Sequence, residues 1–195
     1  MLKPTYTIFA GVNGAGKSSL YNNLILTTEK DFLGKRINTD EIVKEIGDWK
    51  RETDQMKAGR IALAKIKEFF ENKITFNQET TLCGNSILRT IKKAKELGYN
   101  IDLHFVSVNS SDIAKERVHQ RVLKGGHGIP EESIERRFYE SRENLAKISE
   151  YCDKITIYDN TDVLITKVYI RNNNILYKDS NLPIWLDEFV KKLGK

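Results

Sequence analysis

The sequence predicts an α/β fold, a three-layer sandwich in which helices cover both faces of a parallel sheet of about five strands. First, short apolar strands alternate along the chain with amphipathic helical segments, as parallel strands do with their crossover helices. Second, the first strand runs directly into a glycine-rich loop that opens a helix. A C-terminal β-hairpin and a last helix are expected to complete the fold.

Each expected element follows from local composition. Strands are short aromatic or β-branched runs, whereas helices carry apolar residues at a spacing of three to four. Gly98 is typical of a helix end, and Pro130 of a first helical turn. The predicted strands are residues 5–10, 36–38, 73–78, 99–108 and 155–158. The predicted helices are residues 17–26, 54–72, 86–97 and 111–123, with two more that begin near residues 40 and 130.

The chain has 195 residues, a length that suits one compact domain. We expect residues 1–162 to form its main part, including a lid at residues 117–138. We expect residues 163–195 to form an extension of the same domain. In this extension, residues 163–171 and 175–177 are typical of a hairpin around three asparagines, which tolerate positive φ.

The composition excludes several classes of protein. Hydrophobic residues make up 39% and charged residues 30%, which is typical of a globular and not of a disordered chain. The 32 basic and 27 acidic residues leave a net charge of +5, which suits a phosphorylated ligand but indicates no nucleic-acid groove. No apolar run approaches the roughly 20 residues of a membrane span, and no signal-peptide pattern is present. Because Cys83 and Cys152 form neither a disulfide framework nor a metal-binding pair, we expect a reducing, cytoplasmic setting.

Residues 11–18, GVNGAGKS, match the phosphate-binding pattern G-x-x-x-x-G-K-[ST]. Glycines let the backbone wrap around phosphates, and successive amide groups at a helix start form an anion site. Lys17 is expected to reach the β- and γ-phosphates, and the Ser18 hydroxyl to bind Mg²⁺. The fold is therefore predicted to be of the P-loop NTPase type, with ATP and Mg²⁺ as ligands. The residues expected to contact the nucleotide are Gly11, Asn13, Gly14, Ala15, Gly16, Lys17, Ser18 and Ser19.

Nucleotide binding leaves four classes open: a small-molecule kinase, a switch-type NTPase, a nucleic-acid kinase and a catalytically silent binding module. A switch NTPase needs an aspartate at the end of an apolar strand, but the strand at 101–108 is followed by Asn109 and two serines. A nucleic-acid end is less favoured, because basic residues are interleaved with acids, as in KRETDQMKAGR. A catalytically silent binding module is also less favoured, because it would not need the two carboxylates Asp40 and Glu79 that are described next.

Two acidic residues follow or end predicted strands. Asp40 follows the strand at 36–38, where a carboxylate at the sheet edge can accept a proton from a hydroxyl. An equally ordinary role for Asp40 is a helix N-cap. Glu79 follows the strand at 73–78, where it can bind Mg²⁺ through water or orient an acceptor, or simply be a capping or surface carboxylate.

Residues 117–138 are predicted to form a lid over the phosphates. Arg117 and Arg121 share one helix face, a glycine-rich break follows, and the next helix carries Arg136 and Arg137. Arginine suits a lid because its planar guanidinium binds two phosphate oxygens at once. The alternative is a solvated basic face paired with nearby glutamates, and spacing does not separate the two. His127 lies in the break, where it either contacts phosphate or belongs to a turn.

These segments together resemble the zeta-toxin family of P-loop kinases. The similarity runs through GVNGAGKSS, NTDEI, QETTLCG, AKELGYNIDLHFVSV, the lid segment with KGGHGIPEESIERRF, and IYDN at residues 157–160. It covers roughly residues 6–160. The phosphate loop is common to many families, whereas the ETTL segment and the GGH-IP-RRF lid in this order are much more specific.

The resemblance implies transfer of the ATP γ-phosphate to a sugar hydroxyl of a nucleotide sugar, characteristically UDP-N-acetylglucosamine. It also implies a small helical antitoxin as a partner, as for many family members. Carried over by position, the resemblance implies that Asp40 is the catalytic base and Glu79 the active-site glutamate. Glu79 and Ser18 are also the candidate metal ligands. The resemblance matches Lys17 to the phosphate-binding lysine, and either Arg121 or Arg117 to a lid arginine. The well-studied toxins carry a second arginine before the lid proline, where this chain has His127, so Arg137 or Arg136 is expected to supply that charge.

Overall fold

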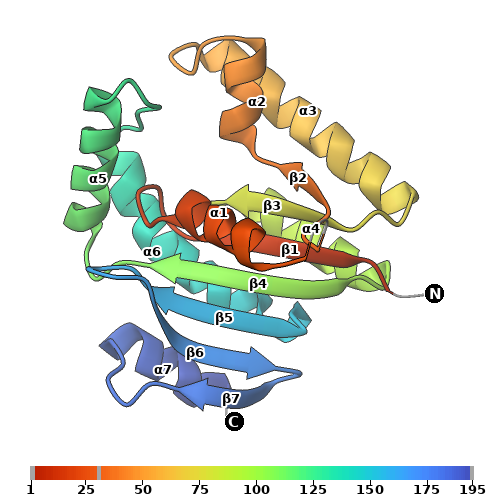
Figure 1. Ribbon diagram of the computed structural model, residues 1–195, viewed down its shortest axis with the longest axis vertical. Helices are drawn as coiled ribbons and strands as arrows, with labels where there is room; N and C mark the ends of the chain where they lie inside the picture. The colour runs from red at the N-terminus through yellow and green to blue at the C-terminus, as the bar shows by residue number, and fades with distance from the viewer. Residues whose placement is uncertain (1–2, 30–31, 194–195) are drawn as a thin grey trace.

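The computed structural model describes residues 3–29 and 32–193. Its strands form one sheet in the order β2-β3-β1-β4-β5-β6-β7 (Figure 1). The strands are β1 (Thr5–Ala10), β2 (Lys35–Ile37), β3 (Phe76–Thr80), β4 (Asn100–Ser107), β5 (Lys154–Asp159), β6 (Ile165–Arg171) and β7 (Asn174–Lys178). The helices are α1 (Lys17–Thr27), α2 (Thr39–Ile46), α3 (Glu52–Glu71), α4 (Asn85–Glu96), α5 (Ser111–Leu123), α6 (Glu131–Ile148) and α7 (Ile184–Leu193), with a short 3₁₀ turn at Ser149–Tyr151.

The predicted fold class is confirmed, and the sheet is larger than five strands. Strands β2, β3, β1, β4 and β5 are parallel. The C-terminal hairpin continues the same sheet, because β6 pairs antiparallel with β5 and β7 with β6. Ile155 and Ile157 of β5 lie opposite Ile170 and Val168 of β6. All four side chains are buried. The pairing also satisfies the backbone N–H and C=O groups that β5 would expose as an edge strand.

Helices lie on both faces of the sheet. In Figure 1, α1 crosses in front of the strands, while α4, α6 and α7 lie behind them. Alternation along β4 separates the two cores: Leu103 and Phe105 pack in the larger core, and Val106 packs with Phe9 in the smaller one. Among the described residues, no helix has both the length and the apolar character needed to cross a membrane.

The carboxyl ends of three parallel strands determine where the site lies. Strand β1 is central, with β3 beside it and β2 beyond β3, and their registers pair Ala10 with Thr80 and Ile37 with Gln78. Because parallel strands end at the same edge, the loops after β1, β2 and β3 meet there. The start of β3 differs from the prediction: the strand begins at Phe76 and includes Glu79, since Lys73 has a φ of 52° and still belongs to the turn after α3.

A half-buried histidine, His104, lies on the α1 side of β4. The His104 ring stacks on Phe9 with the ring centroids 5.3 Å apart, and its Nδ1 lies 3.0 Å from the Tyr158 hydroxyl. Its Nε2 lies 3.5 Å from Asp102 Oδ1. Burial lowers the pKa of His104 below 6.5, although the Asp102 carboxylate opposes this shift. The folded protein therefore keeps this imidazole neutral at a pH where the unfolded chain is protonated.

We expect the free energy of unfolding to fall as the pH drops below about 6.5, because the unfolded state then binds a proton that folded His104 excludes. One such proton gives a slope of at most about 1.4 kcal/mol per pH unit. Substituting His104→Gln should reduce this slope, measured by urea unfolding between pH 7.5 and 5. The matched control is His119→Gln, since His119 is exposed on α5. Equal slopes in His104→Gln and the wild type would contradict the expectation.

Candidate active site

The loop between β1 and α1 has the shape of a phosphate cradle. Gly14 and Gly16 have φ angles of 82° and 103°, in the left-handed region that favours glycine. A Cβ on Gly14 would lie 2.5 Å from the Ala114 carbonyl oxygen, and one on Gly16 would lie 2.3 Å from Asn160 Nδ2. The same Asn160 amide donates a hydrogen bond of 2.8 Å to the Ala15 carbonyl. The glycines are thus required by both torsion angle and close approach, and the loop ends where α1 begins.

Lys17 is the buried cation of this loop. Its Nζ donates to the Val12 carbonyl at 3.1 Å, and the residue is 7% exposed. Burial lowers the pKa of Lys17, and the nearby carboxylates of Glu79 and Asp40 oppose that shift. The ammonium group therefore lies among the predicted loop and carboxylate residues, where an anionic phosphate would replace the hydration that it has lost.

Glu79 is the most heavily bonded carboxylate of the site. Ser18 Oγ, in the first turn of α1, donates to both of its oxygens at 2.8 and 3.1 Å. Asn38 Nδ2 and Arg36 Nη2 donate to Oε2 at 3.1 and 2.9 Å. The hydroxyl and carboxylate predicted for a metal site are therefore in contact. Oxygen ligands of this kind suit Mg²⁺, which takes one or two protein groups together with phosphate oxygens.

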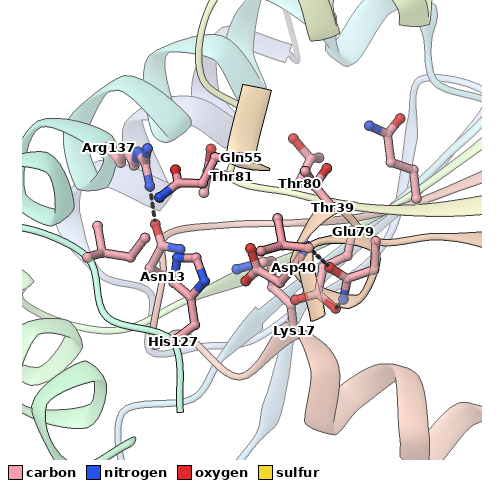
Figure 2. Close-up of a pocket in the computed structure, with 14 residues that line it drawn as sticks. Asn13, Lys17, Thr39, Asp40, Gln55, Glu79, Thr80, Thr81, His127 and Arg137 are labelled. Carbon is pink, nitrogen blue, oxygen red and sulfur yellow. Dashed lines mark hydrogen bonds between the residues drawn. The ribbon is translucent and has the colours of Figure 1, made fainter. Parts of the chain in front are cut away.

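Asp40 lies in the first turn of α2 and is not its N-cap. The N-cap is Asn38, whose Oδ1 accepts a hydrogen bond of 2.9 Å from the Asp40 backbone amide. The Asp40 side chain lines the same cavity as Lys17 and Glu79 (Figure 2). The capping alternative for Asp40 is therefore removed, and its carboxylate faces the space beside the phosphate loop.

This cavity has a volume of about 280 Å³. Figure 2 shows Asp40, Lys17 and Glu79 grouped together, with Arg137 and Asn13 toward the lid. Most of its other lining side chains carry uncharged amides or hydroxyls, which are suited to hydrogen bonding with a hydroxylated molecule. The lining residues are Asn13, Lys17, Asn38, Thr39, Asp40, Val43, Gln55, Gln78, Glu79, Thr80, Thr81, His127, Ile129 and Arg137.

Two of the four lid arginines turn inward. Arg137 Nη1 donates to Asn13 Oδ1 in the phosphate loop at 2.9 Å. Arg121 has buried Nε and Nη2 atoms with no hydrogen-bond partner within the described part of the chain. Burial lowers the pKa of Lys17, and the charges of Arg121 and Arg137 lower it further. A concentration of unsatisfied positive charge at this point fits an anion such as the outer phosphates of a nucleotide.

The other two arginines have different partners. Arg136 forms an ion pair with Glu140 on the exposed side of α6, with 61% of its side chain accessible. Arg117 donates to the Thr161 carbonyl at 2.8 Å, in the loop after β5. The structure therefore brings Arg121 and Arg137 to the predicted site, leaves Arg136 in solvent, and places Arg117 against the loop that follows β5.

His127 is buried beside the cavity and does not supply a lid cation. It is 7% exposed, and its ring centroid lies 5.0 Å from that of Trp49. Burial lowers the pKa of His127, the Asp40 carboxylate opposes the shift, and the lid arginines reinforce it. The imidazole is therefore neutral at pH 7. Its contact with Trp49 joins the lid to the segment between α2 and α3.

Sequence patterns missed several residues that shape this site. Arg36 and Asn38 hold Glu79, Trp49 packs on the lid, and Asn160 closes the phosphate loop. Each acts on a partner far along the chain, so no local spacing identifies it. Asn38 and Asn160 had a signal, since they begin and end the NTDEI and IYDN segments respectively.

A phosphate loop after the central strand, two carboxylates at the ends of the neighbouring strands β2 and β3, and arginines from a helical lid together define a P-loop kinase. Comparison with known families makes the assignment more specific. The family described as Zeta toxin matches residues 2–174, and the chain belongs to that family.

Individual proteins are also similar to this chain. A protein of Haemophilus influenzae, described as uncharacterized, is 32% identical over 130 residues, which are 67% of this chain and 89% of the relative. A chain of the PezAT chromosomal toxin–antitoxin system of Streptococcus pneumoniae has a TM-score of 0.60 at 16% identity, over 99% of this chain and 79% of its own. A chain of the AvrRxo1-ORF1:ORF2 complex with ATP has a TM-score of 0.69 at 14% identity, over 96% and 64%. At these identities the two structures show a shared fold.

Gly14→Ala should destabilise the protein by about 1–3 kcal/mol and weaken nucleotide binding, because Ala at positive φ is strained and its Cβ would collide with the Ala114 carbonyl. The matched control is Gly59→Ala within α3, where an added Cβ meets nothing within 4 Å. That control should gain about 0.5–1 kcal/mol. Urea unfolding and titration with a fluorescent ATP analogue measure both effects. Unimpaired nucleotide binding by Gly14→Ala would show that the loop is not the cradle.

Proposed function

We propose that the protein transfers the γ-phosphate of ATP to a hydroxyl of a small acceptor, most favourably a nucleotide sugar such as UDP-N-acetylglucosamine. The observation that carries this proposal is the grouping of Asp40 with Lys17 and the Ser18–Glu79 pair around one cavity. Membership of the zeta-toxin family supports the nucleotide sugar as acceptor. The hydroxyl- and amide-rich lining of the cavity supports a polyhydroxylated molecule.

In this proposal the chain contributes position and charge. Asp40 orients the acceptor hydroxyl and takes its proton as the new O–P bond forms and the bond to the ADP oxygen breaks. Lys17, Arg121 and Arg137 stabilise the charge that spreads over the transferred oxygens. Ser18 and Glu79 would hold Mg²⁺, which when bound neutralises charge on the outer phosphates. Closure of the lid against Trp49 would exclude water, so that the acceptor and not water receives the phosphoryl group.

We also propose a protein partner. The PezAT structure is that of a toxin–antitoxin system, which supports a small helical antitoxin as a partner of this chain.

Asp40→Asn should lower acceptor phosphorylation by about 10²–10⁴, the usual contribution of a general base, while ATP affinity stays near that of the wild type. Acceptor phosphorylation is measured by mass spectrometry or ³¹P NMR of the product. The acceptors tested are a panel of nucleotide sugars, simple sugars and 5′-hydroxyl oligonucleotides. Near-full phosphorylation by Asp40→Asn would refute its role as base. Product only with a simple sugar or an oligonucleotide would refute the nucleotide-sugar acceptor. ATP binding without any product would make the protein a silent module.

Arg121→Ala and Arg137→Ala should each lower kcat by about 10³, in line with arginines that stabilise the transition state of phosphoryl transfer. The matched control is Arg136→Ala, since this arginine of the same lid pairs with Glu140 in solvent. Its kcat should stay within about twofold of the wild type. A loss for Arg136→Ala as large as that for Arg121→Ala would contradict the assignment of the inward arginines.

A further inference from the structure

Arg36, the middle residue of β2, is a half-buried cation without a part in the proposed chemistry. Its Nη2 lies 2.9 Å from Glu79 Oε2, and its Nη1 donates to Asn77 Oδ1 at 3.3 Å. Its Nε and Nη2 both lie 2.9 Å from Glu41 Oε1. Its side chain is 14% exposed. These contacts with Glu79, Asn77 and Glu41 constrain the orientation of the guanidinium, and Glu79 is one of its partners.

The surroundings of Arg36 hold it in place from two further directions. Its Cζ lies 3.5 Å from the centroid of the Tyr21 ring, so the guanidinium stacks on a side chain of α1. Glu41 draws it toward α2. Arg36 thereby links β2, β3, α1 and α2 at the point where Glu79 meets Ser18. A lysine at this position would offer only a point charge and could not bond Glu41, Asn77 and Glu79 at the same time.

We infer that Arg36 is a positioning residue, which fixes the Glu79 carboxylate against Ser18 and so sets the affinity of the site for Mg²⁺. This inference rests on the proposed role of Ser18 and Glu79 as the residues that would hold the metal. Side chains that orient a metal ligand in this way change metal affinity by about 10- to 100-fold when they are replaced.

The direction in which Mg²⁺ affinity changes when Arg36 is replaced distinguishes a positioning role from a purely electrostatic one. Removing a cation that lies next to a metal site should strengthen Mg²⁺ binding if only charge matters, because repulsion is relieved. Removing a positioning group should weaken it. Arg36 bridges Glu79 and Glu41, which also accept from the two hydrogens of Asn38 Nδ2 at 3.1 and 3.2 Å. Without the cation between them the two carboxylates repel each other, and Glu79 then turns away from Ser18.

The experiment measures nucleotide affinity as a function of Mg²⁺, with a fluorescent non-hydrolysable ATP analogue and no acceptor. For Arg36→Gln we expect affinity in EDTA within about threefold of the wild type, and a Mg²⁺ midpoint raised about 10- to 100-fold. The Mg²⁺ midpoint of Arg36→Lys should lie between those of the wild type and Arg36→Gln. Lysine keeps the positive charge but loses the planar guanidinium that bonds two carboxylates. Arg136→Gln is the matched control, because it removes an arginine whose ion pair lies in solvent. It should leave the Mg²⁺ midpoint unchanged.

An unchanged or lowered Mg²⁺ midpoint in Arg36→Gln, with binding in EDTA intact, would overturn the inference. Loss of binding in EDTA together with a large fall in melting temperature, for Arg36→Gln and Arg36→Lys alike, would also overturn it, because Arg36 would then be structural. The measurement needs no acceptor and no turnover. A failure to find a phosphorylated product would therefore count against the proposed kinase activity and leave the test of Arg36 intact.

Discussion

The hydrogen bonds between Ser18 and Glu79 are the contact on which the arrangement of the site depends. They tie the first turn of α1 to the end of β3, two segments separated by 61 residues. Parallel pairing of β1 with β3 makes the contact available, because both strands end at one edge. Asn38 then joins this pair to the start of α2, and Asp40 follows two residues later. Backbone pairing therefore brings the phosphate loop, the Ser18–Glu79 pair and Asp40 to one edge of the sheet, and side-chain hydrogen bonds then fix their spacing.

The lid completes this site electrostatically. Arg137 contacts the phosphate loop, while Arg121 holds two buried nitrogen atoms without a partner in the described chain. Buried unsatisfied donors carry a free-energy cost of about 1–3 kcal/mol each, which an incoming anion can remove. Burial lowers the pKa of His127, the same positive charges reinforce the shift, and the imidazole stays neutral against Trp49. In the proposed function the lid has two tasks: its arginines bind the anion, and the contact of His127 with Trp49 holds it closed.

Much of this arrangement follows from local sequence. The phosphate loop, the alternation of strands and helices, and the strand ends near Asp40 and Glu79 are all visible as short-range patterns. Long-range partners are not. Neither the choice between Arg121 and Arg136 as inward cations nor the pairing of Arg36 with Glu79 can be read from spacing, since each depends on how helices pack. The hairpin was predicted, but its continuation of the sheet depends on the partners of Ile155 and Ile157, which the local pattern does not name.

The most direct test is a crystal structure of the protein with Mg²⁺ and a non-hydrolysable ATP analogue. We predict Mg²⁺ on the Ser18 hydroxyl beside Glu79, and the γ-phosphate between Lys17 and Arg121, with the Asp40 carboxylate facing its far side. A metal bound away from Ser18, or a γ-phosphate that points out of the cavity and away from Asp40, would contradict the account.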